Sequence, residues 1–246
     1  DGSTPRLPAS RRTSRPTDPH ALKRTMTPEQ RILASWHDNA VPWTRLIQRQ
    51  GIASRRISDP AIEQAILAHQ PGRVLDVGCG EGWLCRHLAS QGIHTTGIDA
   101  IQSLVNSARR QHPDGDYRCL SFDELEESLT ESFDLAVCNF SLFGEQSVEQ
   151  LLADLQTRLT PSGTLLVQTL HPLMACEGKY RNGWRETRWP GSGDDFGDAP
   201  PWYFRTLGNW LSLFQRQGYR VRVEEPLDPQ QAVSYTHLRA HETPEH

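Results

Sequence analysis

The sequence lacks any long apolar run. One of its longest is TLLVQTL (164–170), which has the length of a strand, whereas a helix that spans a bilayer needs about 20 apolar residues. It also lacks the basic start, apolar centre and small-residue cleavage site of a secretory signal peptide. These absences exclude a helical membrane span, and we expect a cytoplasmic protein.

Paired cysteines are missing as well. A zinc site or a disulfide framework needs closer, paired spacing than the chain offers. We therefore expect buried free thiols in a reducing cytoplasm, and no metal site. The five cysteines are Cys79, Cys85, Cys119, Cys138 and Cys176.

A basic surplus is absent too, because the net charge is −4. The one basic segment is residues 1–25, which contain six Lys and Arg and two Asp. The rest of the chain is therefore more acidic than the net charge of the whole chain. Four prolines prevent a long amphipathic helix in this segment. We interpret residues 1–25 as disordered or non-native; a nucleic-acid arm and a transit peptide are the alternatives. Nucleic acid is not the expected partner of the acidic remainder.

The carboxyl-terminal residues 231–246 have no apolar period, and three of the ten histidines of the chain fall within ten residues there. We interpret them as a disordered, non-native tail, with a metal-binding tail as the alternative. Residues 26–230 remain, which is enough chain for one domain with a core of its own.

This middle part alternates short apolar runs with amphipathic segments. Such alternation predicts an α/β fold, a Rossmann-like parallel sheet flanked by helices on both faces. The predicted strands are 73–77, 94–99, 117–121, 133–140 and 164–170. The predicted helices are a first one from Thr27, then 43–50, 59–69, 83–91, 101–111, 148–159 and 206–217.

A glycine-rich loop, VLDVGCGEGW (74–83), follows the first predicted strand. Gly78, Gly80 and Gly82 let the backbone reach positive φ and leave room for a ligand against the chain. A dinucleotide fingerprint would need a third glycine at position 83, where Trp83 stands. An acid, Asp99, ends the next strand, which suits hydrogen bonds from ribose hydroxyls; a helix N-cap is the alternative.

The loop DVGCGEG is similar to motif I of class I S-adenosylmethionine-dependent methyltransferases, and the chain resembles the ubiquinone-biosynthesis-type O-methyltransferases among them. The resemblance covers about residues 70–172, including LTPSGTLLVQTLHP (159–172) as the fifth-strand motif. It implies S-adenosyl-L-methionine as cofactor. The cofactor-binding residues that it implies are Asp76, Gly78, Cys79, Gly80, Gly82, Asp99, Ala100, Ser121, Phe122 and Asn139.

The adenine end of this site departs from the family, which usually has an acid where Ser121 stands. Phe122 can still pack on the adenine ring, and Asp123 either contacts the adenine amino group or caps a helix. Asn139 lies at the end of the fourth strand, where the resemblance places the transferred methyl group.

His171, at the end of the fifth strand, is the candidate catalytic base, because imidazole titrates near neutral pH; the alternative is that it only positions the neighbouring loop. Residues 173–205 form a long segment with aromatic and arginine side chains, which we interpret as an ordered substrate lid that suits a planar or acidic small molecule. Its predicted substrate contacts are Tyr180, Trp184, Arg185, Trp202 and Tyr203.

The family resemblance also implies a final strand antiparallel to the strand at 219–225. The sequence at that place is PLDPQQ followed by the histidine-rich tail, so this strand is missing or replaced. The predicted function is methyl transfer from S-adenosylmethionine to an oxygen or nitrogen of a small molecule. A nucleic-acid methyltransferase and a non-catalytic S-adenosylmethionine-binding protein are the alternatives. The sequence leaves the oligomeric state open.

Overall fold

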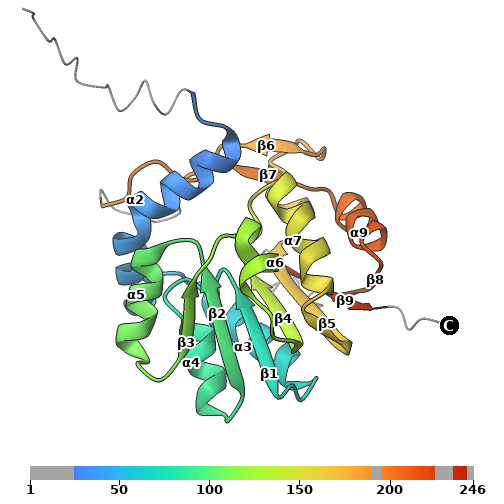
Figure 1. Cartoon of the computed structure of the whole chain (residues 1–246). Helices are drawn as coiled ribbons and strands as arrows, with labels where there is room; N and C mark the ends of the chain where they lie inside the picture. Colours follow the sequence, from blue (N-terminus) through green and yellow to red (C-terminus); the bar gives the residue numbers. More distant parts are fainter. Residues whose placement is uncertain (1–24, 190–194, 225–234, 243–246) are drawn as a thin grey trace, which may run out of the picture.

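The computed structural model describes residues 25–189, 195–224 and the backbone of 235–242 (Figure 1). Residues 1–24 lie outside this part, as do 231–234 and 243–246, so the interpretation of the basic segment (1–25) and of the tail beyond these bounds stays a prediction. Cys79, Cys85 and Cys138 are buried free thiols, as predicted, whereas the prediction of burial is wrong for the half-buried Cys119 and Cys176. None of the helices in the described part is long and apolar enough to cross a membrane.

Five parallel strands form the centre of the molecule, in the order β3-β2-β1-β4-β5 (Figure 1). Their carboxyl ends therefore meet at one edge of the sheet. The predicted Rossmann-like α/β fold is confirmed. The strands are β1 (Arg73–Val77), β2 (His94–Asp99), β3 (Asp116–Cys119), β4 (Phe133–Asn139) and β5 (Leu159–Leu170).

Helices cover both faces of this sheet, because its strands carry apolar side chains on both sides. In β1, Val74 packs with the helices of one face, whereas Leu75 and Val77 pack with those of the other. The first face carries α3 (Arg55–Leu67), α4 (Trp83–Ser90) and α5 (Gln102–Gln111). The second carries α6 (Leu125–Ser128), α7 (Gln146–Gln156) and α9 (Leu207–Arg216), with the short 3-10 helix η1 (Phe122–Glu124) before α6.

An antiparallel strand completes the sheet beyond β5. It is β9 (Tyr235–Glu242), which pairs antiparallel with β5 on one side and with β8 (Tyr219–Glu224) on the other. Of the two alternatives for the final strand, missing or replaced, the structure thus shows the second. The prediction of a disordered tail is wrong for residues 235–242, because the open edges of β5 and β8 supply partners for their backbone groups.

The amino-terminal helix α2 (Pro28–Gln48) is continuous, where two helices were predicted. Its predicted start is confirmed, since the Thr27 side chain accepts a hydrogen bond from the Gln30 backbone in a capping box. Pro42 lies inside it and removes one backbone donor. Packing on both sides of this proline compensates for the lost hydrogen bond, because Ala40 and Trp43 belong to a cluster with residues at the start of α5.

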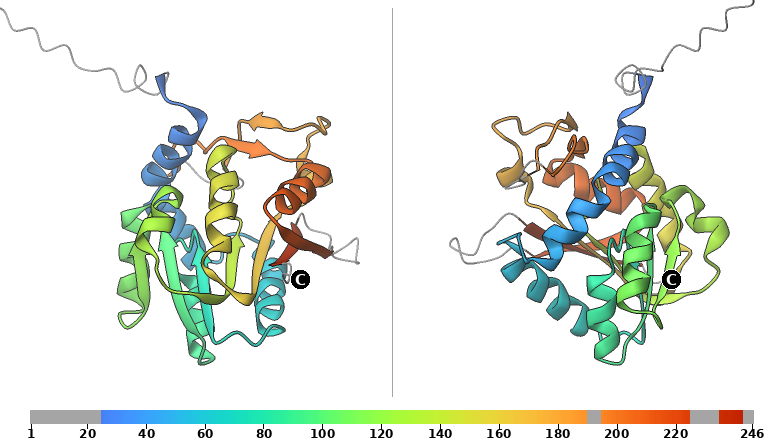
Figure 2. Two further views of the ribbon diagram at one scale, coloured as in Figure 1. Left: turned by 45° about the vertical axis from the view of Figure 1, so that its right-hand side comes forward. Right: turned by 90° about the vertical axis from the view of Figure 1, so that its left-hand side faces the viewer.

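The helix α3 begins at Arg55, four residues before the predicted N-cap at Asp59. Asp59 instead pairs within the helix, accepting from the Arg55 Nε at 2.8 Å. The remaining elements are α8 (Pro172–Ala175) and the antiparallel pair β6 (Gly183–Arg185) and β7 (Trp202–Phe204). Figure 2 shows this pair and α2 on the same end of the molecule, above the sheet.

Candidate functional site

The glycine-rich loop joins β1 to α4 at the carboxyl edge of the sheet. Gly78, Gly80 and Gly82 have φ values of +77°, +58° and +80°, the left-handed region that glycine alone adopts without strain. A Cβ at Gly78 would lie 2.4 Å from the Cβ of Ser141, so that turn admits no side chain. A Cβ at Gly80 would meet nothing within 4 Å, so the loop borders open space there.

Asp99 ends β2 beside this loop. One carboxylate oxygen accepts the Gly80 backbone N–H at 2.9 Å, and the other accepts that of Ile101, the N-cap of α5, at 2.8 Å. The alternative reading of Asp99 as the N-cap of α5 is wrong, because Ile101 holds that position and no side chain caps the helix. Each carboxylate oxygen has a second lone pair, so Asp99 retains acceptor capacity for the two ribose hydroxyls of a nucleoside.

Burial sets the electrostatics of this edge. It raises the pKa of Asp76 to about 7 and that of Asp99 to about 6, both from the usual value near 4. Hydrogen bonds oppose the shift: the Cys85 thiol donates to Asp76, and two backbone N–H groups donate to Asp99. The charges of Asp99 and Glu81 add to the shift of Asp76. A site with the two buried acids Asp76 and Glu81 and the half-buried Asp99 favours a cationic ligand.

The predicted residues Cys79 and Ala100 offer backbone rather than side chains. The Cys79 side chain packs into a buried cluster with α5, where burial raises the pKa of its thiol. The backbone oxygen of Ala100 lies 3.7 Å from the Cys119 sulfur. Any contact of these two residues with a cofactor would therefore come from the main chain.

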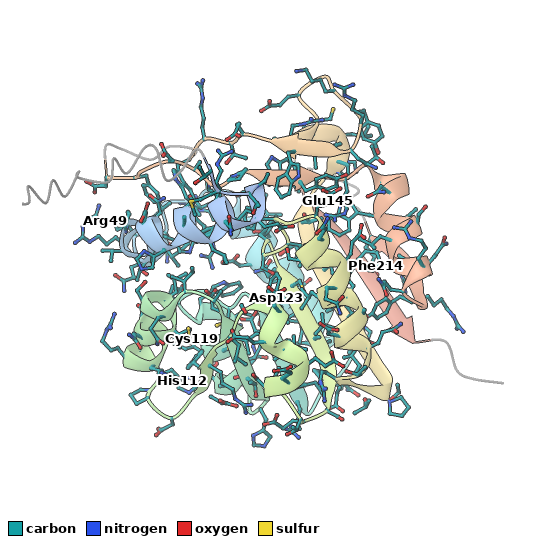
Figure 3. All side chains as sticks on the ribbon, turned by 45° about the horizontal axis from the view of Figure 1, so that its top comes forward. Arg49, His112, Cys119, Asp123, Glu145 and Phe214 are labelled. Carbon is teal, nitrogen blue, oxygen red and sulfur yellow. The ribbon has the colours of Figure 1, made fainter. Side chains whose placement is uncertain are left out.

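At the end of β3, both hydrogen-bond donors of Ser121 have an acceptor within the protein. Its backbone N–H and its hydroxyl both donate to Glu124, at 2.8 and 2.7 Å, in a capping arrangement for η1. Phe122 is half-buried and packs partly against the core, and Asp123 is exposed. Figure 3 shows Cys119 and Asp123 on this side of the sheet, away from Glu145 at the head of α7.

Asn139 ends β4, next to β1, and its buried side-chain oxygen has no hydrogen-bond partner among the described residues. Ser141, two residues further, donates its hydroxyl to the Val77 backbone oxygen at 2.6 Å. This bond ties the turn after β4 to the glycine loop. The ends of β1, β2 and β4 thus bring together glycine backbone, a carboxylate and an amide.

A cover lies over this edge, made of α2 and the described residues of the lid segment, 173–189 and 195–205 (Figure 2). Asn39 of α2, fully buried, accepts the Gly197 N–H at 2.7 Å and donates to the Asp198 backbone oxygen at 3.1 Å. Arg31 of α2 forms a two-bond pair with Glu186, at 2.9 and 2.7 Å. The lid segment is therefore fastened to α2.

Aromatic rings fill the junction between α2, the lid segment and the turn after β4. The Trp36 ring centre lies 5.2 Å from those of Trp43 and Trp189 and 5.6 Å from that of Phe143. The Trp189 ring also meets Phe196, at 4.9 Å. All five rings are half-buried, so they offer apolar surface at the site as well as to one another.

The predicted lid residues gather on the β6–β7 pair. Trp184 packs on Tyr203 at 5.5 Å, on one side of the hairpin, and Tyr203 donates its backbone N–H to the Phe143 oxygen at 2.7 Å. Trp202 and Arg185 lie against Phe204 on the other side. The Tyr180 ring also faces Phe204, and its hydroxyl accepts the Leu207 N–H. Their predicted contact with a substrate stays a prediction.

Sequence comparison decides the family of this fold and site. Residues 36–225 match the Methyltransferase domain family, which is more than three quarters of the chain. The chain belongs to this family. The resemblance seen in the glycine-rich loop is thereby confirmed, and with it the enzyme class, S-adenosylmethionine-dependent methyltransferases, and the cofactor of that class.

Among curated relatives of this methyltransferase, the ubiquinone biosynthesis O-methyltransferase of Rickettsia typhi is 30% identical over 103 residues. The match covers 40% of this chain and 41% of the relative, so this chain spans about two fifths of the relative's length. Among solved structures, an S-adenosylmethionine-dependent methyltransferase from Mesorhizobium loti is 26% identical, with a TM-score of 0.56 over 72% of this chain and 96% of that one.

A third similar protein shares the fold over nearly the whole chain. It is the 1,6-didemethyltoxoflavin-N1-methyltransferase of Burkholderia thailandensis, 18% identical, with a TM-score of 0.59 over 94% of this chain and 92% of that one. This similarity covers a larger share of the chain than the family match does.

His171 of this methyltransferase is the N-cap of α8, where its Nδ1 accepts the Leu173 backbone N–H at 3.2 Å. The alternative role, positioning of the neighbouring loop, thus has a physical basis. With Nδ1 as acceptor, the neutral ring carries its hydrogen on Nε2 and acts there as a donor. The base role stays a prediction, and it requires the ring to release the Leu173 N–H.

Three residues with marked roles were not predicted as site residues. The partners of Glu29 and Arg205 are distant in the sequence, whereas Glu81 bonds the nearby Trp83 and Arg86. Glu81 is buried beside the glycine loop, and one of its carboxylate oxygens lacks a partner among the described residues. Glu29 of α2 accepts three backbone N–H groups at the start of α7. Arg205 is buried and donates to the Gly144 and Glu145 backbone oxygens. Only the glycine spacing around Glu81 gave a local signal.

Proposed function

We propose that this chain transfers the methyl group of S-adenosylmethionine to an oxygen or nitrogen nucleophile of a small molecule. The observation that carries the proposal is the fastened cover. Asn39 and Arg31 hold the lid segment to α2 over the carboxyl edge of the sheet. A site beneath such a cover suits a molecule small enough to be enclosed, whereas a nucleic-acid strand needs an open, basic groove.

The residues of the carboxyl edge fit the cofactor of this family. The open space before Gly80 admits a ligand against the backbone, and the remaining lone pairs of Asp99 suit its two ribose hydroxyls. Phe122 offers an apolar ring for adenine. S-adenosylmethionine supplies an activated methyl group on a sulfonium, which needs no further activation by the protein.

The task of the chain is then to align the acceptor and to exclude water, and orientation of this kind contributes roughly 7–11 kcal/mol to lowering a barrier. The Trp36, Phe143 and Trp189 rings supply apolar walls for a planar acceptor. A hydroxyl acceptor must also lose a proton, which is the step for which His171 remains the candidate.

The names of similar proteins support both acceptor atoms. The Rickettsia typhi relative is an O-methyltransferase, and the Burkholderia thailandensis structure is an N1-methyltransferase with bound 1,6-didemethyltoxoflavin and S-adenosylhomocysteine. The second protein has the present fold and takes a small molecule. We therefore propose the small-molecule class and leave the acceptor atom as oxygen or nitrogen.

The test is transfer of labelled methyl groups from S-adenosylmethionine, with the full chain incubated separately with a metabolite extract, with nucleic acid and with protein. We expect label in a discrete metabolite, and its loss in the Asp99→Ala variant. Label confined to nucleic acid or protein would overturn the small-molecule proposal. Binding of S-adenosylmethionine with no label in any fraction would favour the non-catalytic alternative.

A further inference from the structure

The ring of Tyr117, in β3, lies directly against the end of the glycine-rich loop. It is 3% exposed, and three glycines pack on it. A Cβ would lie 2.6 Å from its Cε1 at Gly82, 2.9 Å from its Cδ1 at Gly97 and 2.5 Å from its Cε2 at Gly115. No side chain larger than hydrogen fits between the ring and these three backbones. The ring is therefore held in one place, and so is the hydroxyl oxygen at its end.

The Tyr117 hydroxyl group joins two helices. Its oxygen lies 3.4 Å from the backbone oxygen of Gly82, to which the hydroxyl can donate, and 3.1 Å from Nδ1 of His112. Gly82 is the N-cap of α4, and His112 is the C-cap of α5. The Gly82 oxygen accepts the Arg86 backbone N–H at 3.0 Å, and its second lone pair can accept from the hydroxyl. The hydroxyl thus connects the glycine-rich loop to a histidine at the end of another helix.

The hydroxyl carries one hydrogen, so it donates either to Gly82 or to His112. When Nδ1 of His112 carries a hydrogen, it donates to the hydroxyl oxygen, and the hydroxyl hydrogen goes to Gly82. When Nδ1 carries none, it accepts the hydroxyl hydrogen, and the Gly82 oxygen loses this donor. A protonated imidazole has a hydrogen on both ring nitrogens. Protonation of His112 therefore always directs the Tyr117 hydrogen to the loop.

His112 borders an open cavity of about 660 Å³ at the amino edge of the sheet. It is half-buried, so solvent protons reach its ring. The other charged or titratable side chains that line this cavity are Arg73, His94, Asp114 and Asp116. Asp116 pairs with Arg118 at 2.7 Å, and Arg109 of α5 donates to the Tyr117 backbone oxygen at 2.6 Å. Since imidazole gains its second hydrogen roughly between pH 5 and 8, the solvent pH at this edge acts on the loop through two side chains.

We propose that Tyr117 is a positioning residue for the glycine-rich loop, and that protonation of His112 directs the Tyr117 hydroxyl hydrogen to Gly82. The bond to Gly82 holds the loop in the conformation that admits the cofactor, so less freedom is lost on binding and the affinity is higher. The affinity for the cofactor therefore has a component that rises as His112 gains its proton. The inference rests on the proposed use of S-adenosylmethionine and adds pH regulation to that site.

The test is calorimetric titration of S-adenosylhomocysteine into the full chain and into its Tyr117→Phe variant, at pH 5.5 and at pH 8. The variant keeps the ring among the three glycines and removes only the hydroxyl group. We expect it to bind about fivefold more weakly than the wild type at pH 5.5, and less than about twofold more weakly at pH 8. Asp76 and Asp99 also change ionisation in this range, but they do so in both proteins, so the ratio of the two affinities cancels their effect.

Two outcomes of this comparison would overturn the inference. An equal loss of affinity at both pH values would show that the hydroxyl acts without His112. No loss at either pH value would show that the hydroxyl does not position the loop.

Two histidine variants separate His112 from the other groups at the cavity. In a His112→Gln background, the effect of Tyr117→Phe should be equal at the two pH values, because no titrating ring faces the hydroxyl. In the matched His94→Gln background, which removes another histidine of the same cavity, the effect should still depend on pH. A pH dependence that persists without His112 would belong to another group and would contradict the inference.

A measurement on the wild-type chain is independent of any destabilisation by Tyr117→Phe. By linkage, a ligand that binds the protonated form more tightly raises the pH at which that group titrates. Saturation with S-adenosylhomocysteine should therefore raise the titration midpoint of the His112 ring, followed by NMR and assigned with His112→Gln. Binding with an unchanged midpoint would overturn this inference and leave the proposed function standing. A folded wild-type chain that binds no S-adenosylhomocysteine would overturn the proposed function itself.

Discussion

Asp76 stands in a buried strand with 2% of its surface exposed, and the Cys85 thiol is its one donor in the described part. Burial raises its pKa to about 7. Ionisation of Asp76 is therefore less favourable in the folded chain than in the unfolded one. This cost is fully present above pH 7, and it is relieved as the pH falls from 7 towards the usual value of the group. The buried Asp76 carboxylate, which favours a cationic ligand, thus lowers the free energy of unfolding.

We predict that Asp76→Asn raises the free energy of unfolding, and that the gain is roughly 3 kcal/mol larger at pH 8 than at pH 5, since the pKa of about 7 lies two units above pH 5 and each unit corresponds to about 1.4 kcal/mol. Urea denaturation at the two pH values measures it. Asp114→Asn, in an exposed turn, is the control and should show no such difference. An equal effect of Asp76→Asn at both pH values would contradict the assigned ionisation.

The residues of the site were predictable to the extent that they are local in sequence. The glycine spacing and the acid at the end of the next strand lie within 25 residues, and the structure brings Gly80 and Asp99 into direct contact. Glu81 was not predicted, because no sequence pattern marks the burial of its side chain within the loop. Ser121 remains a predicted cofactor residue, although its backbone N–H and its hydroxyl both donate to Glu124.

At the scale of elements, α2 and α7 meet through one carboxylate. Glu29 of α2 accepts the backbone N–H groups of Glu145 and Gln146, at 2.8 and 3.1 Å, and the Ser147 hydroxyl at 2.8 Å. It thus caps a helix more than 100 residues away and places its charge at the positive end of the helix dipole. Figure 3 shows Glu145 at this junction, beneath the β6–β7 pair.

We predict that Glu29→Ala lowers the free energy of unfolding by about 1–2 kcal/mol, because the backbone donors at the start of α7, two of them partly buried, lose their acceptor. The conservative variant Glu29→Gln keeps one acceptor oxygen and should lose about half as much. Urea denaturation gives the values, and hydrogen exchange of the amides at 145–147 should accelerate in the Ala variant. Unchanged exchange there would exclude the cap.

Element types followed from sequence periodicity, whereas several element ends did not. The alternating runs predicted all five parallel strands. Of these, β1, β4 and β5 are largely buried, β2 is buried in its second half, and β3 has one buried residue. The helix α2 passes through Pro42 since packing around Ala40 outweighs the lost hydrogen bond. The strand β9 has no apolar alternation that signals it; backbone pairing with β5 and β8 defines it.

At the scale of the whole molecule, β9 closes the sheet. It pairs with seven residues of β5 and six of β8, so its loss would leave two unpaired strand edges. We predict that truncation after residue 230 lowers the melting temperature and promotes aggregation, which calorimetry and light scattering measure. Removal of residues 243–246 alone, beyond β9, is the control. A truncated chain as stable as the full one would show that β9 contributes nothing to the fold.

The most direct test of the account is calorimetric titration of S-adenosylhomocysteine into the full chain and into its Asp99→Ala variant. The Gly80 N–H donates to the Asp99 carboxylate and so joins Asp99 to the glycine-rich loop. We predict one site with micromolar affinity in the wild type, and a loss of at least 100-fold in a variant that remains folded. A folded wild-type chain without binding, or undiminished binding by Asp99→Ala, would contradict a cofactor site at the carboxyl edge of the sheet.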